Sequence, residues 1–113
     1  MLMHTVSTYP SDEKHLNLKC INTLQNKYSL PIGYSGHEVT VSPSIVAASL
    51  GAGAIERHIT LDRAMYGSDQ AASVEPSGIR SLISSATKIS LAMGDGDKKI
   101  INDEIPIAKK LRQ

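Results

Sequence analysis

Two histidines each stand at the end of a short apolar run, and they are the residues best suited to chemistry. His37 follows the run at residues 30–34, and His58 follows the run at residues 53–57. Imidazole is the commonest side-chain ligand for transition metals, and two such ligands leave coordination positions for water and substrate oxygens. Two ligands are too few for a structural zinc site. The histidines could share one metal ion, or each could form a separate hydrogen bond at the end of its strand.

The segment between the histidines predicts how they are brought together. Residues 41–50 are rich in small and aliphatic side chains and are followed by Gly51, which is typical of a helix with a glycine at its C-terminus. With the apolar runs as strands, this is one βαβ unit whose strands are parallel neighbours joined by a right-handed crossover. The carboxyl ends of parallel strands lie at one edge, where α/β folds bind ligands. Both histidines are therefore expected at that edge.

A further strand and helix precede this unit. Residues 1–6 predict a short strand, and Ser11 or Asp12 is a suitable N-cap for a helix over residues 12–27. The buried side of that helix is expected to contain apolar residues at three- and four-residue spacing, namely Leu16, Cys20, Ile21 and Leu24.

A long loop and a last helix follow the second histidine. Residues 60–76 are polar and have no clear period, and loops of this length are often functional. Pro76 opens a helix that is expected to end at residues 94–96, and residues 97–113 are predicted to be a polar linker or solvated tail. The buried side of the helix is expected to contain Ile79, Leu82, Ile83, Ala86, Ile89 and Met93.

Composition narrows the class of protein. The 113 residues suit one domain, and the net charge of +1 gives no reason to expect a nucleic-acid or membrane partner. The first ten residues predict no signal peptide, and no apolar run has the length of a transmembrane helix. Cys20 is the only cysteine, which excludes an internal disulfide and favours a cytoplasmic location. Three parallel strands alone would leave exposed edges, so a missing part or a partner is expected.

Several motifs, taken together, resemble the sialic acid synthase family. They are STYP at 7–10, IGYSGHE at 32–38, LGA at 50–52, IERHITLD at 55–62, GSDQ at 67–70 and SVEP at 73–76. The combination covers nearly the whole chain and is more specific than any one motif. GYSGHE together with ERHITLD argues against another barrel aldolase or phosphosugar synthase, such as the 3-deoxy-sugar acid synthases.

The resemblance implies a partial TIM barrel, an α/β fold. Members of the family are (β/α)₈ barrels of ~250 residues, and residues 1–96 resemble strands six to eight with their helices. Residues 97–113 resemble the linker toward an antifreeze-like domain that is not part of this sequence. The expected partner is a complementing N-terminal barrel half or further copies of the chain, and the chain alone is expected to be inactive.

The resemblance also implies an activity. Family members condense phosphoenolpyruvate with an N-acyl-mannosamine-type sugar, giving a nonulosonic (sialic) acid and phosphate, with Mn²⁺ or Mg²⁺ as cofactor. His37 and His58 align with the metal ligands and are expected to be catalytic together with Tyr9. The alternative is a non-catalytic metal- or sugar-binding remnant that associates with itself.

Four residues are expected to contact substrates by the same resemblance. Ser7 and Tyr9 match positions that face the two substrates, although many relatives carry Asn in place of Ser7, and Tyr9 could instead pack beside Pro10. Ser35 resembles a contact to the phosphate or carboxylate of phosphoenolpyruvate, or it could hydrogen-bond its own turn. Asp69 aligns with a carboxylate that binds sugar hydroxyls, or it could be a turn residue.

Four charged or imidazole side chains are expected to be structural or are left open. Glu38 and His4 are expected to have structural roles. Glu56 and Arg57 alternate with His58 along a strand, so at most one of them shares its face, and an ion pair outside the barrel is the simpler expectation.

Overall fold

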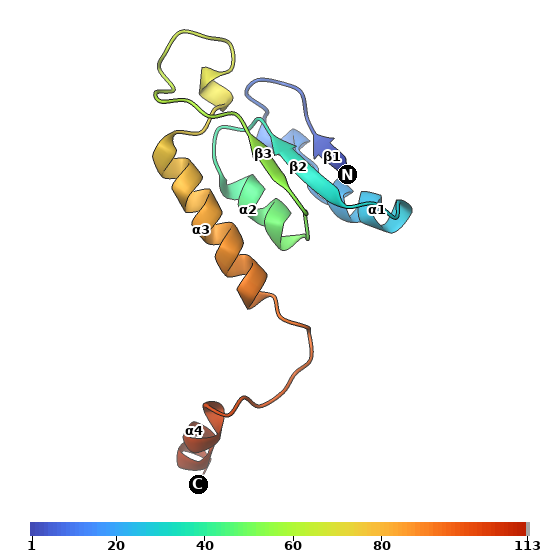
Figure 1. Cartoon of the computed structure of the whole chain (residues 1–113), viewed down its shortest axis with the longest axis vertical. Helices are drawn as coiled ribbons and strands as arrows, with labels where there is room; N and C mark the ends of the chain where they lie inside the picture. Colours follow the sequence, from blue (N-terminus) through green and yellow to red (C-terminus); the bar gives the residue numbers. More distant parts are fainter. Residues whose placement is uncertain (113) are drawn as a thin grey trace.

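A parallel sheet of three strands forms the centre of the protein, in a computed structural model that describes residues 1–112 (Figure 1). The strands are β1 (Leu2–Thr5), β2 (Ile32–Gly36) and β3 (Ile55–Arg57), in the spatial order β1-β2-β3. Each is followed by a helix, so the predicted succession of three βα units and the parallel pairing of neighbouring strands are both confirmed. The fold class is α/β.

Helical segments connect the strands and extend beyond them. They are η1 (Glu13–His15), α1 (Cys20–Lys27), α2 (Ser42–Ser49), η2 (Gln70–Ala72), α3 (Pro76–Ala92) and α4 (Glu104–Leu111), where η1 and η2 are short 3₁₀-helices. None of the helices among residues 1–112 is long and apolar enough to cross a lipid bilayer.

The core lies between the sheet and the first two helices. Ile21 of α1, Ile32 and Tyr34 of β2 and Ala47 of α2 are all buried and form one cluster. Side chains alternate between the two faces of a strand, so Gly33 and Ser35 point to the opposite face. There Gly33 pairs with Met3 and Ser35 with Glu56 in the strand register. One face of the sheet therefore packs against the helices, and the other carries the polar pair Ser35 and Glu56 beside Met3 and Gly33.

The predicted helix over residues 12–27 is wrong as a continuous element. Asp12 does act as an N-cap, but it caps η1, where its side chain accepts a hydrogen bond from the Lys14 backbone N–H. Asn17 then adopts a φ of +44°, a left-handed conformation that ends a helical run. The chain resumes as α1 only at Cys20. Of the residues expected on the buried side, Leu16 and Ile21 are buried, whereas Cys20 and Leu24 are partly exposed.

The two later helices begin and end close to the predicted residues. Gly51 follows α2 with a φ of +87°, as expected for a glycine beyond a helix C-terminus. Pro76 is the first residue of α3, where its missing N–H costs nothing. On α3, Leu82 is buried, but Ile83 is 61% and Met93 60% exposed, so their predicted burial is wrong.

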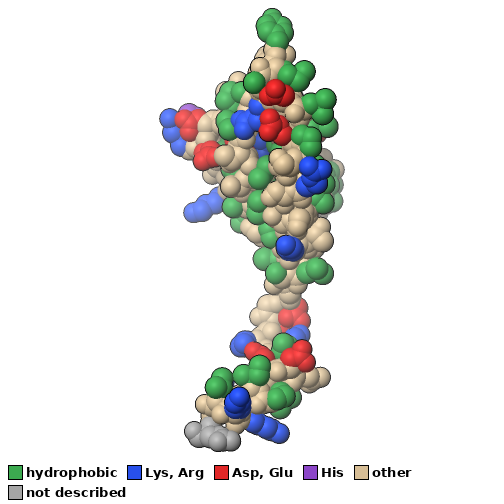
Figure 2. Space-filling view, turned by 90° about the vertical axis from the view of Figure 1, so that its left-hand side faces the viewer, with side chains coloured by type: hydrophobic (Ala, Val, Ile, Leu, Met, Phe, Trp, Pro, Cys, Tyr) green, Lys and Arg blue, Asp and Glu red, His purple; other side chains and the backbone are tan. Residues whose placement is uncertain are grey.

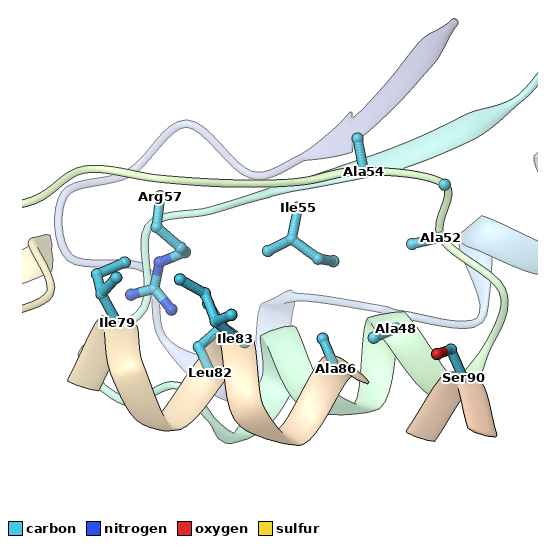
Figure 3. A pocket seen from close by; sticks show the side chains of 11 residues that line it. Ala48, Ala52, Ala54, Ile55, Arg57, Ile79, Leu82, Ile83, Ala86 and Ser90 are labelled. Atoms are coloured by element: carbon cyan, nitrogen blue, oxygen red, sulfur yellow. The ribbon is translucent and has the colours of Figure 1, made fainter. Parts of the chain in front are cut away.

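The exposed side of α3 has a clear cause. α3 packs mainly against α2, and a cavity of about 500 Å³ separates it from β3. In Figure 3, Ile55 of β3 faces Ile83 and Ala86 of α3 across this space. Figure 2 shows hydrophobic side chains scattered among charged and polar ones on one face of the molecule.

The polar tail contains a helix that the sequence analysis does not predict. α4 lies apart from the sheet at the end of an extended segment (Figure 1). Its apolar residues have no cover among residues 1–112, since Ile105, Ile107 and Leu111 are all exposed.

We expect two Ile→Ala substitutions, one in the core and one on the surface, to differ strongly in their effect on the free energy of unfolding. Ile21→Ala removes buried methyl groups from the cluster beneath the sheet and is expected to lower the free energy of unfolding by about 2–5 kcal/mol. Ile107→Ala, at a side chain that is 57% exposed on α4, is the matched control and should change it by less than about 0.5 kcal/mol. Urea unfolding followed by circular dichroism measures both, and equal effects would show that the core is elsewhere.

Candidate functional site

Three rings meet at the carboxyl edge of the sheet. The ring centroids of His37 and His58 lie 5.2 Å apart, and the Tyr9 ring is 4.3 Å from His37 and 5.5 Å from His58. Tyr9 belongs to the loop after β1, and each histidine comes directly after β2 or β3. The prediction that both histidines lie at the same edge is therefore confirmed.

The position of His37 is set by its neighbours. Its side chain is buried, and its Nδ1 lies 2.8 Å from the Val6 backbone oxygen. Because a carbonyl can only accept, Nδ1 must carry the proton and donate it. The lone pair of Nε2 is then free for a ligand, as is usual for a histidine whose other nitrogen bonds a carbonyl. The His37 backbone oxygen in turn accepts a hydrogen bond from the Ser11 N–H at 2.9 Å.

His58 is more open to solvent. Its Nδ1 lies 3.7 Å from Oδ2 of Asp69, and these side chains are 35% and 47% exposed. The Val74 backbone N–H donates to the His58 oxygen at 2.8 Å, so the returning loop is tied to the end of β3. Asp69, which precedes η2 in that loop, is thereby brought to the histidine pair.

The other predicted residues are Ser35 on β2 and Ser7 in the loop after β1. Ser35 donates to Glu56 Oε1 at 2.8 Å across β2 and β3, so its hydroxyl is engaged by a carboxylate rather than by its own turn. Ser7 is exposed in the loop that carries Tyr9. Tyr9 itself is 42% exposed and precedes Pro10 through a cis peptide bond.

A buried ion pair lies on the other side of the same strand ends. Arg57 Nη1 is 3.0 Å from Glu38 Oε1, and the two side chains are 1% and 0% exposed. Glu38 also accepts from the Tyr34 hydroxyl at 2.9 Å and from the Ser44 hydroxyl at 3.1 Å. Burial, together with the charge of Glu38, raises the pKa of Tyr34, whereas burial lowers the pKa of Arg57 against the opposing effect of Glu38.

A metal ion at this edge would need ligands from outside the described residues. Among residues 1–112, no group of three or more His, Cys, Asp or Glu side chains is arranged around one point. His37 and His58 offer two imidazoles, with the remaining positions open to water or substrate. This donor set suits a catalytic divalent ion better than a structural zinc.

Sequence reasoning missed several partners in the site. Glu56 shares a face with Ser35, and the two-residue spacing of Glu56 and His58 was the available signal. Arg57 does form an ion pair, as the sequence analysis expects, and its partner is Glu38. Nothing in the sequence indicated that the Val6 carbonyl would fix the tautomer of His37, since that contact joins residues 31 positions apart.

Comparison with known proteins identifies the family of this chain. The NeuB family matches residues 1–98. The chain belongs to the NeuB family. It is similar to N,N'-diacetyllegionaminic acid synthase of Legionella pneumophila, with 34% identity over the whole chain and 32% of that protein. It is 38% identical to the human N-acetylneuraminate-9-phosphate synthase over 96% of the chain and 31% of that protein.

A solved structure carries the same fold. The N-acetylneuraminic acid (sialic acid) synthetase from Leptospira borgpetersenii, crystallised with citrate, matches with a TM-score of 0.82 and 36% identity. The match covers 99% of this NeuB chain and 40% of that structure. The chain spans about a third of the length of the curated relatives it matches. The sialic acid synthase resemblance seen in the motifs is thus confirmed.

The Tyr34 phenol predicts a loss of stability at high pH. The folded protein keeps this buried phenol protonated, while in the unfolded chain it ionises near its ordinary pKa of 10.0. Above pH 10 the unfolded state binds fewer protons, so the free energy of unfolding falls by up to about 1.4 kcal/mol per pH unit. Denaturant unfolding of wild type and Tyr34→Phe between pH 9 and 11 measures this, and the variant should lack that part of the decline.

The exposed Tyr28 gives a matched control for the same substitution. Tyr28→Phe should follow the wild-type pH dependence. A Tyr34→Phe profile that declines as steeply as wild type would show that this phenol does not control stability at high pH.

Proposed function

We propose that this chain carries the metal-binding edge of a nonulosonic acid synthase site. The reaction joins C3 of phosphoenolpyruvate to the aldehyde carbon of an N-acyl-mannosamine-type sugar, water adds at C2, and inorganic phosphate leaves. The observation that carries the proposal is the convergence of His37 and His58, with ring centroids 5.2 Å apart, in a chain of the NeuB family.

The residues present suit a divalent cation. His37 has one nitrogen committed to the Val6 carbonyl and the other free, which fixes the ring in the tautomer that a ligand needs. His58 stands beside it with the Asp69 carboxylate 3.7 Å away. His37 and His58 would hold the ion, and Mn²⁺ or Mg²⁺ bound there supplies a Lewis acid for the sugar aldehyde.

The other predicted residues would serve the substrates. Tyr9 packs against both imidazoles and restricts how a ligand can approach them. Asp69 is half-exposed beside His58 and can accept hydrogen bonds from sugar hydroxyls. Ser35 points along the same face of the sheet, and its present acceptor is Glu56. A contact of Ser35 with phosphoenolpyruvate would require that hydroxyl to turn from Glu56 to the substrate.

We also propose that the three βα units are the last three of a (β/α)₈ barrel. The strands are parallel, the core lies on one face of the sheet, and both β1 and β3 have an unpaired edge among residues 1–112. The apolar cavity between β3 and α3 (Figure 3) lies beside the free edge of β3. A further strand and helix would cover both surfaces. The remaining units would come from a complementing polypeptide or from further copies of the chain.

The metal site predicts a direct binding result. Titration of the 113-residue chain with Mn²⁺, followed by calorimetry, should show one bound ion per chain. His37→Ala and His58→Ala should each weaken binding at least ~10-fold, because each removes one of only two protein ligands.

His15→Ala is the matched control, since His15 is exposed at the end of η1. It should bind Mn²⁺ like wild type. If all three variants bind equally, the ion does not use the histidine pair and the proposed site is wrong.

A further inference from the structure

We propose that Arg57 and Glu38 are positioning residues, whose buried ion pair holds the strand ends so that His37 and His58 face each other. The inference rests on the proposed metal site and adds to it two residues that would not touch the ion. Each member of the pair is the immediate neighbour of one histidine in the sequence, Glu38 of His37 and Arg57 of His58.

The guanidinium of Arg57 joins three separate segments. Nη1 donates to the Glu38 carboxylate at 3.0 Å and to the Thr40 backbone oxygen at 2.9 Å, both in the connection from β2 to α2. It also contacts the Ser44 hydroxyl of α2 at 3.0 Å. Nη2 donates to the Glu38 backbone oxygen and, at 3.4 Å, to the oxygen of Ala72 in the loop after β3.

These contacts fix the backbone on both sides of the site. Side chains alternate along a strand, so Arg57 points toward the helices while its neighbour His58 points toward Tyr9 and His37. Glu38 and His37 likewise point to opposite faces. A rotation of either strand end that moved one histidine would have to break the contacts of the ion pair, because Glu38 is adjacent in the chain to His37 and Arg57 to His58.

Stability alone does not account for the pair. The Nε of Arg57 is buried without a hydrogen-bond partner among residues 1–112, and desolvation opposes the guanidinium charge. Buried ion pairs are often no more stabilising than apolar residues of similar volume, because two charges must be taken out of water. The planar fork of Arg supplies directional contacts in several directions at once, which neither an apolar side chain nor Lys provides.

The test uses Arg57→Lys, which keeps the positive charge and removes the planar guanidinium group. In the full chain this substitution should weaken Mn²⁺ binding about 10- to 100-fold, as loss of an outer-shell partner typically does. It should also remove the nuclear Overhauser effects between the His37 and His58 ring protons in the metal-free protein. Ile21→Ala is the control, since Ile21 is buried on α1, is not among the residues that line the cavity beside Arg57, and its truncation lowers Tm. It should retain wild-type Mn²⁺ affinity and ring contacts.

Two outcomes would overturn the inference. One is an Arg57→Lys protein that is folded, as judged by circular dichroism, and keeps both wild-type affinity and wild-type ring contacts. The other is an Ile21→Ala protein that loses affinity to the same extent at equal Tm, because the effect would then follow from general destabilisation.

A milder variant covers the case in which Arg57→Lys does not fold. Ser44→Ala removes one hydroxyl that touches both members of the pair, and it should weaken Mn²⁺ binding several-fold and reduce the ring contacts. Unchanged values would reject the positioning role. If wild type binds no Mn²⁺, the proposed metal site fails, and the ring contacts of Arg57→Lys and Ser44→Ala in the metal-free protein still decide whether the pair positions the histidines.

Discussion

Parallel pairing of β1, β2 and β3 is the constraint on which the rest of the structure depends. Because the strands run in one direction, the loops that follow them leave from one edge and bring Tyr9, His37 and His58 together. The register also sets Ser35 beside Glu56, one alternation earlier on the same face. A shift of β3 by one residue would turn His58 toward the helices and Arg57 toward the site. The register of β3 therefore decides which of its side chains face the histidine pair.

Neighbouring residues at the strand ends point to opposite faces of the sheet. His37 and His58 face the open side of the sheet, whereas Glu38 and Arg57 face the helices and are closed off from solvent. The buried pair would be costly if either partner were lost, since the remaining charge would stay in a medium of low dielectric constant. On the face of the histidines, His37 is buried and bonded to the Val6 carbonyl, whereas His58 and Asp69 remain partly exposed. Rigid support beneath an accessible site is an arrangement that suits a metal-assisted reaction.

The apolar surfaces fit a chain that completes a larger structure. Parallel sheets are generally covered on both faces and seldom leave free edges. Here the cavity beside β3, the exposed Ile83 of α3 and the uncovered α4 all lie outside the core cluster. The chain also spans only about a third of its curated relatives. In the proposed barrel, further βα units would pair with β3 and fill the cavity, which would convert exposed apolar area into core.

The sequence by itself determined the succession of three βα units, the end of α2 before Gly51, the start of α3 at Pro76 and the family, because periodicity, capping and motifs are local. It also placed His37 and His58 at one edge, since that follows from parallel connectivity. The break at Asn17 and the helix at residues 104–111 are local as well, but the periodicity and capping signals did not predict them. Only the tertiary structure decided that α3 packs on α2 rather than on β3. The pairing of Arg57 with Glu38 likewise required the structure, because their contact spans 19 residues and depends on the register between β2 and β3.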